Sequence, residues 1–139
     1  MKKLAIFVEG QTEQIFIEKL LKEIAGENNI TIVTEKAKKN SAGNRIFSEL
    51  KLEKITDKTV FYILIRDSSS DEKVKSDILD TIEALNKSGY ELVIGLRDIY
   101  PKNEEDLRKY LYYGVPTKFI PIKLVLAKME LEAWFIAEH

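Results

Sequence analysis

Short apolar runs alternate along this chain with longer segments in which apolar residues recur at helical spacing. The runs are five or six residues long and end in polar or turn-forming residues, which is typical of strands buried on both faces of a sheet. We predict strands over Leu4–Val8, Ile30–Thr34, Val60–Ile65, Leu92–Leu96 and Ile122–Ala127. Helices between the strands let each strand return parallel to its neighbours. The pattern predicts an α/β fold: a single-domain, mainly parallel five-stranded sheet with helices on both faces, over residues 1–139.

The helices are predicted from apolar spacing and from the residues that begin and end them. The first runs from about Thr12, as N-cap, to Ala25, and carries Ile17, Leu20, Leu21 and Ile24. After a polar loop over residues 35–45, a short helix is predicted over Ile46–Leu52. A long helix follows the Ser68–Asp71 turn, ends at Gly89, and carries Val74, Ile78, Ile82 and Leu85 on one face. Two more are predicted over about Glu104–Tyr113 and Met129–His139. The last breaks off in mid-pattern, which is compatible with a longer natural chain.

The composition excludes several chemistries. The chain has no cysteine, and its one histidine is His139. Disulfides, thiolate nucleophiles and a Ser-His-Asp triad are therefore excluded, and a metal site must use oxygen ligands, which favours Mg²⁺, Mn²⁺ or Ca²⁺. The absence of cysteine is also compatible with a reducing cytosol, and no apolar run is long enough to cross a membrane. We expect a cytoplasmic protein. Its net charge of −1 gives no general basic field, although a local basic strip is still compatible with nucleic acid.

Acidic residues stand at or near the ends of four of the five predicted strands. They are Glu9, Asp67, Asp98 and the pair Glu130 and Glu132. In open α/β sheets, sites form outside the carboxyl ends of the strands, and clustered carboxylates repel one another unless a cation lies between them. The alternative is that each acid caps the helix that follows it. That alternative is weaker for Glu9, because glutamate is a poor N-cap.

Two segments carry a resemblance to a known family. Val8-Glu9-Gly10-Gln11-Thr12-Glu13 resembles the first motif of the TOPRIM domain, the metal-binding module of topoisomerases, primases and the OLD-type nucleases of phage defence. The segment from Ala127 to Phe135, which contains Glu-Leu-Glu-Ala-Trp, resembles the Glu-x-Glu-Ala-Trp segment of small OLD-like TOPRIM proteins. The two motifs bracket the chain in the family's order.

The resemblance implies a set of site residues. Glu9 and Glu13 would be the acids of the first turn, and Glu130 and Glu132 those of the last segment. Asp98 would match the first aspartate of the family's Asp-x-Asp, whose second position is Tyr100. The other candidate is Asp67, where the second position is Ser69. Neither strand end gives a complete Asp-x-Asp.

The same resemblance implies metal-dependent cleavage of a phosphodiester in nucleic acid, with DNA favoured over RNA. The carboxylates would hold Mg²⁺ or Mn²⁺, Glu9 is the first candidate for general base, and Arg66 or Arg97 could stabilise negative charge. Each arginine also has a structural interpretation, as the ion-pair partner of an aspartate. Lys36, Lys38, Lys39 and Arg45 could follow a phosphate backbone, or form a solvated loop. Leu131 and Trp134 are read as core residues.

These observations leave three functional hypotheses. The first is a metal-dependent nuclease of the TOPRIM type, with a role in phage defence. The second is a degenerate TOPRIM-like module that binds metal, nucleic acid or another protein without cleaving. The third is a doubly wound domain whose strand-end acids are only helix caps. A domain of this size could also work with a second chain, either a partner protein or another copy.

Overall fold

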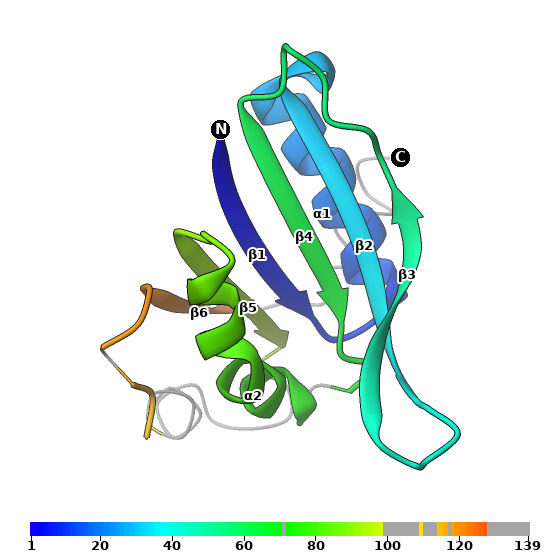
Figure 1. The fold of residues 1–139 in the computed structure, drawn as a ribbon, viewed down its shortest axis with the longest axis vertical. Helices are drawn as coiled ribbons and strands as arrows, with labels where there is room; N and C mark the ends of the chain where they lie inside the picture. The colour runs from blue at the N-terminus through cyan, green and yellow to red at the C-terminus, as the bar shows by residue number, and fades with distance from the viewer. Residues whose placement is uncertain (71, 99–108, 110–113, 117, 128–139) are drawn as a thin grey trace.

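The protein forms one mixed sheet of six strands in an α/β arrangement (Figure 1). The computed structural model describes residues 1–70, 72–98, 109, 114–116 and 118–127. Its elements are β1 (Lys2–Val8), α1 (Gln11–Ala25), the 3-10 turn η1 (Glu27–Asn29), β2 (Ile30–Lys39), β3 (Arg45–Leu52), β4 (Phe61–Asp67), α2 (Lys73–Lys87), β5 (Leu92–Asp98) and β6 (Ile122–Ala127). The strand order is β3-β2-β4-β1-β5-β6, and every neighbouring pair is parallel except β2 and β3. The α/β class and the mainly parallel sheet are confirmed, whereas five strands is wrong.

The additional strand replaces the predicted loop and short helix. β2 continues to Lys39, the chain turns, and β3 returns antiparallel beside it. The turn is closed by Asn40, whose Oδ1 accepts hydrogen bonds from the backbone N–H groups of Ala42 and Asn44. The prediction of a helix over Ile46–Leu52 is wrong, because this segment pairs antiparallel with β2 over Val33–Lys39. Phe47 packs edge-on against Phe7, with ring centroids 6.1 Å apart.

The two described helices cover opposite faces of the sheet. From α2, Val74, Ile78, Ile82 and Leu85 pack into a cluster with Ala5, Phe7, Leu64 and Val93, as predicted for that helix. On the other face, Ile17, Leu21 and Ala25 of α1 pack against Ile6, Val8, Ile32 and Ile65. The predicted helix at about Glu104–Tyr113 and the segment Met129–His139 lie outside the described residues.

Both helices begin differently from the prediction. Thr12 lies inside α1, and the N-cap is Gly10, whose extended backbone makes no side-chain capping hydrogen bond. The N-cap of α2 is Glu72, again without a side-chain capping bond. Ser68, Ser69 and Ser70 lie before it, and Asp71 lies outside the described residues. β1 connects to α1 through Glu9 and Gly10, and packing of α1 on the sheet stabilises this junction.

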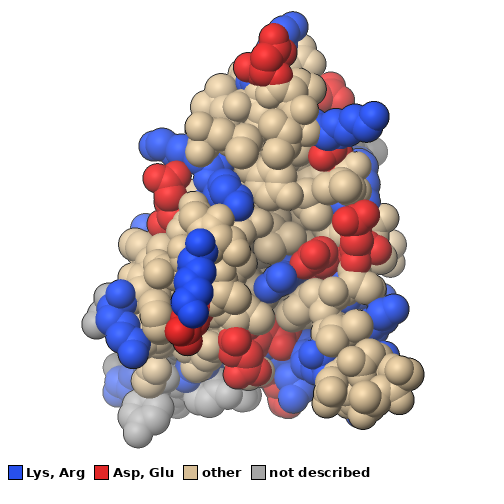
Figure 2. Space-filling model, viewed as in Figure 1, with Lys and Arg blue, Asp and Glu red and all other residues tan. Residues whose placement is uncertain are grey.

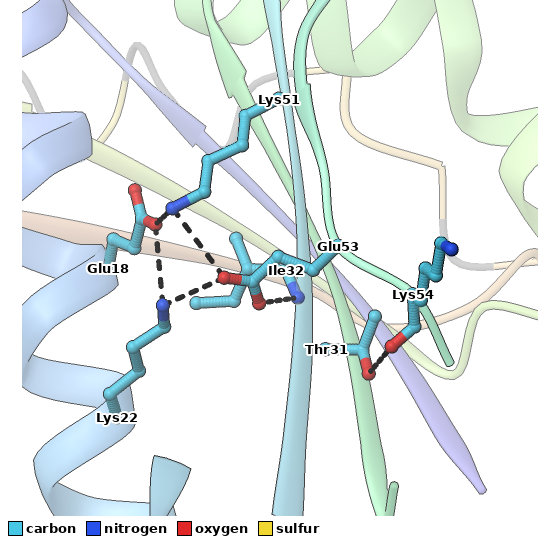
Figure 3. A network of polar contacts seen from close by, with 7 residues as sticks. All are labelled: Glu18, Lys22, Thr31, Ile32, Lys51, Glu53 and Lys54. Atoms are coloured by element: carbon cyan, nitrogen blue, oxygen red, sulfur yellow. Dashed lines mark hydrogen bonds and ion pairs between the residues drawn. The ribbon is translucent and has the colours of Figure 1, made fainter. Parts of the chain in front are cut away.

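A polar network fastens α1 to the edge of the sheet (Figure 3). Lys22 Nζ lies 2.8 Å from Glu53 Oε2, and Lys51 Nζ lies 2.8 Å from Glu18 Oε1. The other oxygen of Glu53 accepts a 2.9 Å hydrogen bond from the backbone N–H of Ile32. Burial alone would raise the pKa of Glu53, but the bonds from Lys22 and Ile32 outweigh it and hold this pKa below its ordinary value. The network therefore joins α1, β2 and the residue that follows β3.

Candidate functional site

The strand order brings the ends of β4, β1 and β5 together at one edge of the sheet. Val8 is paired with Asp67, and β5 runs parallel to β1 on its other side. Glu9, the residue after β1, therefore stands between the end of β4 at Asp67 and the end of β5 at Asp98. For Asp98, the structure describes the backbone position at the end of β5 but not the side chain. Glu130 and Glu132 lie outside the described residues.

The first turn of α1 directs two acids to this edge. Glu9 and Glu13 are both half-buried, and a Cβ built on Gly10 would lie 3.3 Å from Glu13 Oε2. The Glu13 carboxylate is therefore folded back over the turn that connects β1 to α1. An acid in the first helical turn is also favoured by the helix dipole.

Asp67 is held rigidly where β4 ends. Its side chain is buried, and its Oδ1 accepts a 2.7 Å hydrogen bond from the backbone N–H of Ser69. Ser69 has a positive φ of 59°, an uncommon conformation for a residue other than glycine. The backbone N–H of Ser68 donates a 2.9 Å hydrogen bond to the carbonyl of Val8, which ties the exits of β4 and β1 together. These contacts fix the Asp67 carboxylate beside the turn that carries Glu9.

The two candidate arginines have different surroundings. Arg66 Nε donates a 2.8 Å hydrogen bond to Glu35 Oε1, and its guanidinium lies 4.7 Å from the centroid of the Phe47 ring. Arg66 therefore forms its ion pair with Glu35 on the neighbouring strand. The prediction of an ion pair between Arg66 and an adjacent aspartate is wrong. Arg97 is buried in β5, directly before Asp98. Along a strand, adjacent side chains point to opposite faces, so Arg97 lies on the α2 face with Gly95.

The basic residues named from the sequence separate into two groups. Lys36, Lys38 and Lys39 are exposed on the part of β2 that reaches and passes the end of β4, where Lys36 is paired with Asp67. The β2–β3 hairpin therefore projects beyond the edge that carries the acids (Figure 1). Arg45 is engaged with Asp77 on α2. The face shown in Figure 2 carries lysine, arginine, aspartate and glutamate interspersed, without a broad patch of one sign.

Three buried polar side chains near this edge had not been singled out from the sequence. Gln14 Oε1, Thr34 Oγ1 and Ser68 Oγ are buried and accept or donate no hydrogen bond with any described residue. Gln14 lies three residues before Ile17, on the side of α1 that faces the sheet. A polar residue among the apolar residues of that side is the sequence feature that could have identified it. An unsatisfied buried polar group costs roughly 1–3 kcal/mol. Such groups are tolerated where a ligand or water completes them.

The described side chains do not by themselves assemble a complete metal centre. Among the side chains described, no group of three or more acids is close enough to hold one ion. The side chains of Asp98, Glu130 and Glu132, three of the proposed ligands, are not among them. A cleft of about 490 Å³ lies at the other end of the strands, lined by residues such as Lys22, Thr31, Glu53 and Thr59.

Comparison with known proteins gives no relative for this chain. No protein-family model, curated protein or solved structure matches it. Within the described part of the chain, every helix is too short or too polar to cross a membrane.

Proposed function

We propose that this protein hydrolyses phosphodiester bonds in nucleic acid with the help of Mg²⁺ or Mn²⁺, as a nuclease of the TOPRIM type. The observation that carries the proposal is the position of Glu9 between the strand ends at Asp67 and Asp98. Parallel strands gather their carboxyl ends at one edge, and here three neighbouring strands end in an acid. Helix capping does not account for this, since neither described helix has a side-chain cap.

The donor set fits a hard divalent cation. Glu9, Glu13, Asp67 and Asp98 would hold it, joined by Glu130 and Glu132, and the chain has no cysteine or internal histidine to favour zinc. A metal ion bound there would polarise the phosphoryl oxygen and lower the pKa of the attacking water. Glu9 would accept the proton of that water. Arg97, which the sequence suggested for stabilising the charge on the phosphoryl group, is buried on the α2 face of β5, and the proposal gives it no contact with the substrate.

The projecting hairpin supplies a route for the substrate. Lys36 is in register with Asp67, and Lys38 and Lys39 continue along the strand past it. Three exposed lysines beside an acidic edge could bind the phosphates that flank the cleaved bond, while the metal neutralises the acids. DNA is the substrate we favour, in the setting of phage defence, and a partner protein or second copy could complete its binding surface.

A cleavage assay tests the proposal directly. Plasmid and single-stranded DNA would be incubated with the protein and Mg²⁺ or Mn²⁺, with EDTA as the metal-free control. Glu9→Gln should abolish cleavage while the far-UV circular dichroism spectrum stays unchanged. Glu23→Gln, an exposed acid on the same helix, is the matched control and should cleave like the wild type. Cleavage that persists in Glu9→Gln, or that survives EDTA, would count against the proposal.

A specific observation favours a second candidate, a module that binds metal or nucleic acid without cleaving. Ser69 stands where a second aspartate would complete Asp-x-Asp, and its backbone already occupies one oxygen of Asp67. Ser69→Asp is the discriminating variant, because aspartate tolerates positive φ better than most residues. Under this second candidate, wild type binds Mn²⁺ weakly and does not cleave, and Ser69→Asp binds it several-fold more tightly. An unchanged affinity in Ser69→Asp would exclude Asp67 from the metal site.

A further inference from the structure

The α2 face of the sheet carries a groove beside that helix. α2 packs over β1 and β5, whereas the chain passes from β2 to β4 through β3 and residues 53–60. Among the described elements, no helix therefore lies over β4 and β2 on this face (Figure 1). A groove of about 320 Å³ lies there, between α2 and the two strands. Its lining includes three charged residues and two tyrosines, which are Lys3, Glu35, Arg66, Tyr62 and Tyr90.

The inner surface of the groove is apolar. Val33 and Leu64 line it from the sheet and Leu85 lines it from α2, and all three are buried. Small-molecule sites are typically hollows of about 300–1,000 Å³ with apolar walls and a few polar groups that orient the ligand. The groove has the size and the composition of such a site.

Lys3 lies at one end of the groove, held by three contacts. Its Nζ donates a 2.7 Å hydrogen bond to the carbonyl of Ser88, and it lies 4.5 Å from the centroid of the Tyr90 ring and 5.5 Å from that of Tyr62. An ammonium group has three N–H donors, so the bond to Ser88 leaves two of them. Burial raises the pKa of Tyr90 to about 12, so its hydroxyl is protonated at neutral pH and can also donate. This end of the groove suits an anion.

The other end offers both donors and an acceptor. Arg66 Nε donates a 2.8 Å hydrogen bond to Glu35 Oε1, and the guanidinium is packed on the Phe47 ring. The Nη groups of Arg66 and Oε2 of Glu35 take no part in that bond. Lys3 is in register with Tyr62, and Arg66 lies four residues farther along β4. At the usual rise of a strand, the two ends are about 13 Å apart along the sheet.

We propose that this groove binds a free nucleoside monophosphate, with its phosphate at Lys3 and its base toward Glu35. The groove requires an anion for Lys3, a flat body for the apolar surface beside Tyr62, and an N–H donor for Glu35. A nucleoside monophosphate meets all three requirements, since bases pack on aromatic side chains and their amino groups donate to carboxylates. Inorganic phosphate lacks the ring, an uncharged nucleoside lacks the anion, and a simple aromatic carboxylate lacks the N–H donor.

Binding in this groove does not depend on the proposed cleavage. Adjacent side chains of a strand point to opposite faces, so Asp67 lies on the α1 face and Arg66 on the α2 face. A nucleotide held by Lys3 and Glu35 is therefore separated from the acidic edge by the sheet, and it needs no metal ion.

Isothermal titration calorimetry of the full chain in EDTA tests the proposal. The probe is guanosine 5′-monophosphate, because guanine offers neighbouring imino and amino N–H groups to Glu35. Guanosine and inorganic phosphate should each bind at least about tenfold more weakly, the effect of losing one charge-assisted hydrogen bond or more. Equal affinity for the nucleotide and either of these fragments would overturn the proposal. Tighter binding of the dinucleotide pGpG would also overturn it, because the groove would then belong to a nucleic-acid strand.

Two variants with matched controls locate the bound nucleotide. Lys3→Met should weaken binding about tenfold or more, whereas Lys2→Met, at an exposed lysine on the opposite face of β1, should not. Ala84→Phe fills the groove from an exposed position on α2, so it should abolish binding without disturbing the core. Its control is Glu83→Phe, at the preceding exposed residue of the helix. Wild-type affinity in both Lys3→Met and Ala84→Phe would overturn the proposal.

Glu9→Gln separates the groove from the acidic edge. This variant should bind guanosine 5′-monophosphate like the wild type in EDTA. Binding that requires Mg²⁺, or that is lost in Glu9→Gln, would place the nucleotide at the acidic edge and overturn the groove as its site. Binding by a wild type that cleaves no substrate would support the groove and count against the proposed cleavage alone.

Discussion

Arg45 on β3 donates two hydrogen bonds to Asp77 on α2. They measure 2.8 Å from Nε to Oδ1 and 2.7 Å from Nη2 to Oδ2. The same Nη2 donates a 2.7 Å hydrogen bond to the carbonyl of Ser68. The Asp77 side chain is 3% exposed, and its hydrogen bond raises the pKa of Arg45 above its ordinary value. One guanidinium thus fastens the β2–β3 hairpin to α2 and to the exit of β4. Arg45 positions the hairpin that carries the exposed lysines.

Removal of the Asp77 charge should destabilise the fold. Asp77→Asn leaves the Arg45 guanidinium without its bidentate partner, and removal of one member of a buried pair costs roughly 3–5 kcal/mol. Because the Arg45 side chain is 34% exposed, water replaces part of the loss, and we expect about 2 kcal/mol. Urea unfolding measures the change. Asp80→Asn, an exposed acid one turn along α2, should stay within about 0.5 kcal/mol of wild type. Equal stability of Asp77→Asn and wild type would show that the pair contributes nothing.

The Glu53 network should make stability depend on acid pH. Glu53 has a folded-state pKa below its ordinary value of 4.5, so its ionised form stabilises the fold at pH values above 4.5. That contribution is lost as the pH falls through the lowered pKa. The difference in free energy of unfolding between wild type and Glu53→Gln should therefore be full near pH 7 and shrink toward zero in stronger acid. Denaturant unfolding at a series of pH values checks this, with the exposed Glu23→Gln as control. A difference that does not vary with pH would contradict it.

Two glycines should respond very differently to alanine. A Cβ on Gly95 would lie 2.6 Å from Leu124 Cδ2 and 2.8 Å from Ile78 Cδ1, inside the packed layer between the sheet and α2. Gly95→Ala should therefore cost about 1–3 kcal/mol through overpacking. At Gly10 the nearest atom is the mobile end of Glu13 at 3.3 Å, so Gly10→Ala should cost less than about 1 kcal/mol. Thermal and urea unfolding of the two variants compare them, and a reversed order would show that the sheet does not pack on α2 as described.

The hairpin lysines should control the salt dependence of DNA binding. Replacing Lys36, Lys38 and Lys39 together by alanine should lower the affinity and reduce the slope of log K against log salt by up to about 0.9 for each phosphate that is no longer neutralised. Fluorescence anisotropy with labelled DNA, titrated at several salt concentrations, measures both quantities. Replacing Lys54 and Lys58, which lie at the other end of the strands, should change neither. The free energy of unfolding should stay the same, because the three lysines are exposed. Equal slopes for the triple variant and wild type would remove the hairpin from the nucleic-acid site.

The positions of most strands and helices could be predicted from the sequence, but which strands lie side by side in the sheet could not. The apolar run at Leu4–Val8 identified β1 because a buried strand and its burial pattern are local properties. The β2–β3 hairpin was missed because Lys36, Lys38 and Lys39 make the segment look like a polar loop, although Lys38 and Lys39 pair with Ile46 and Arg45 of β3. The ion pair between Arg45 and Asp77 could not be predicted either, because the two residues are 32 positions apart in the sequence. The site was predicted as a set of strand ends, but their order in the sheet is a long-range property.

That order has a consequence for how the protein is made. β1 is a central strand that is translated before both of its neighbours: Lys2 pairs with Phe61 and Leu4 with Leu92. At a synthesis rate of about 5–20 residues per second, the nascent β1 waits about 3–12 seconds before its first neighbour is translated. Over that interval this apolar strand has no strand to pair with, and α1 is the only described element that can cover it.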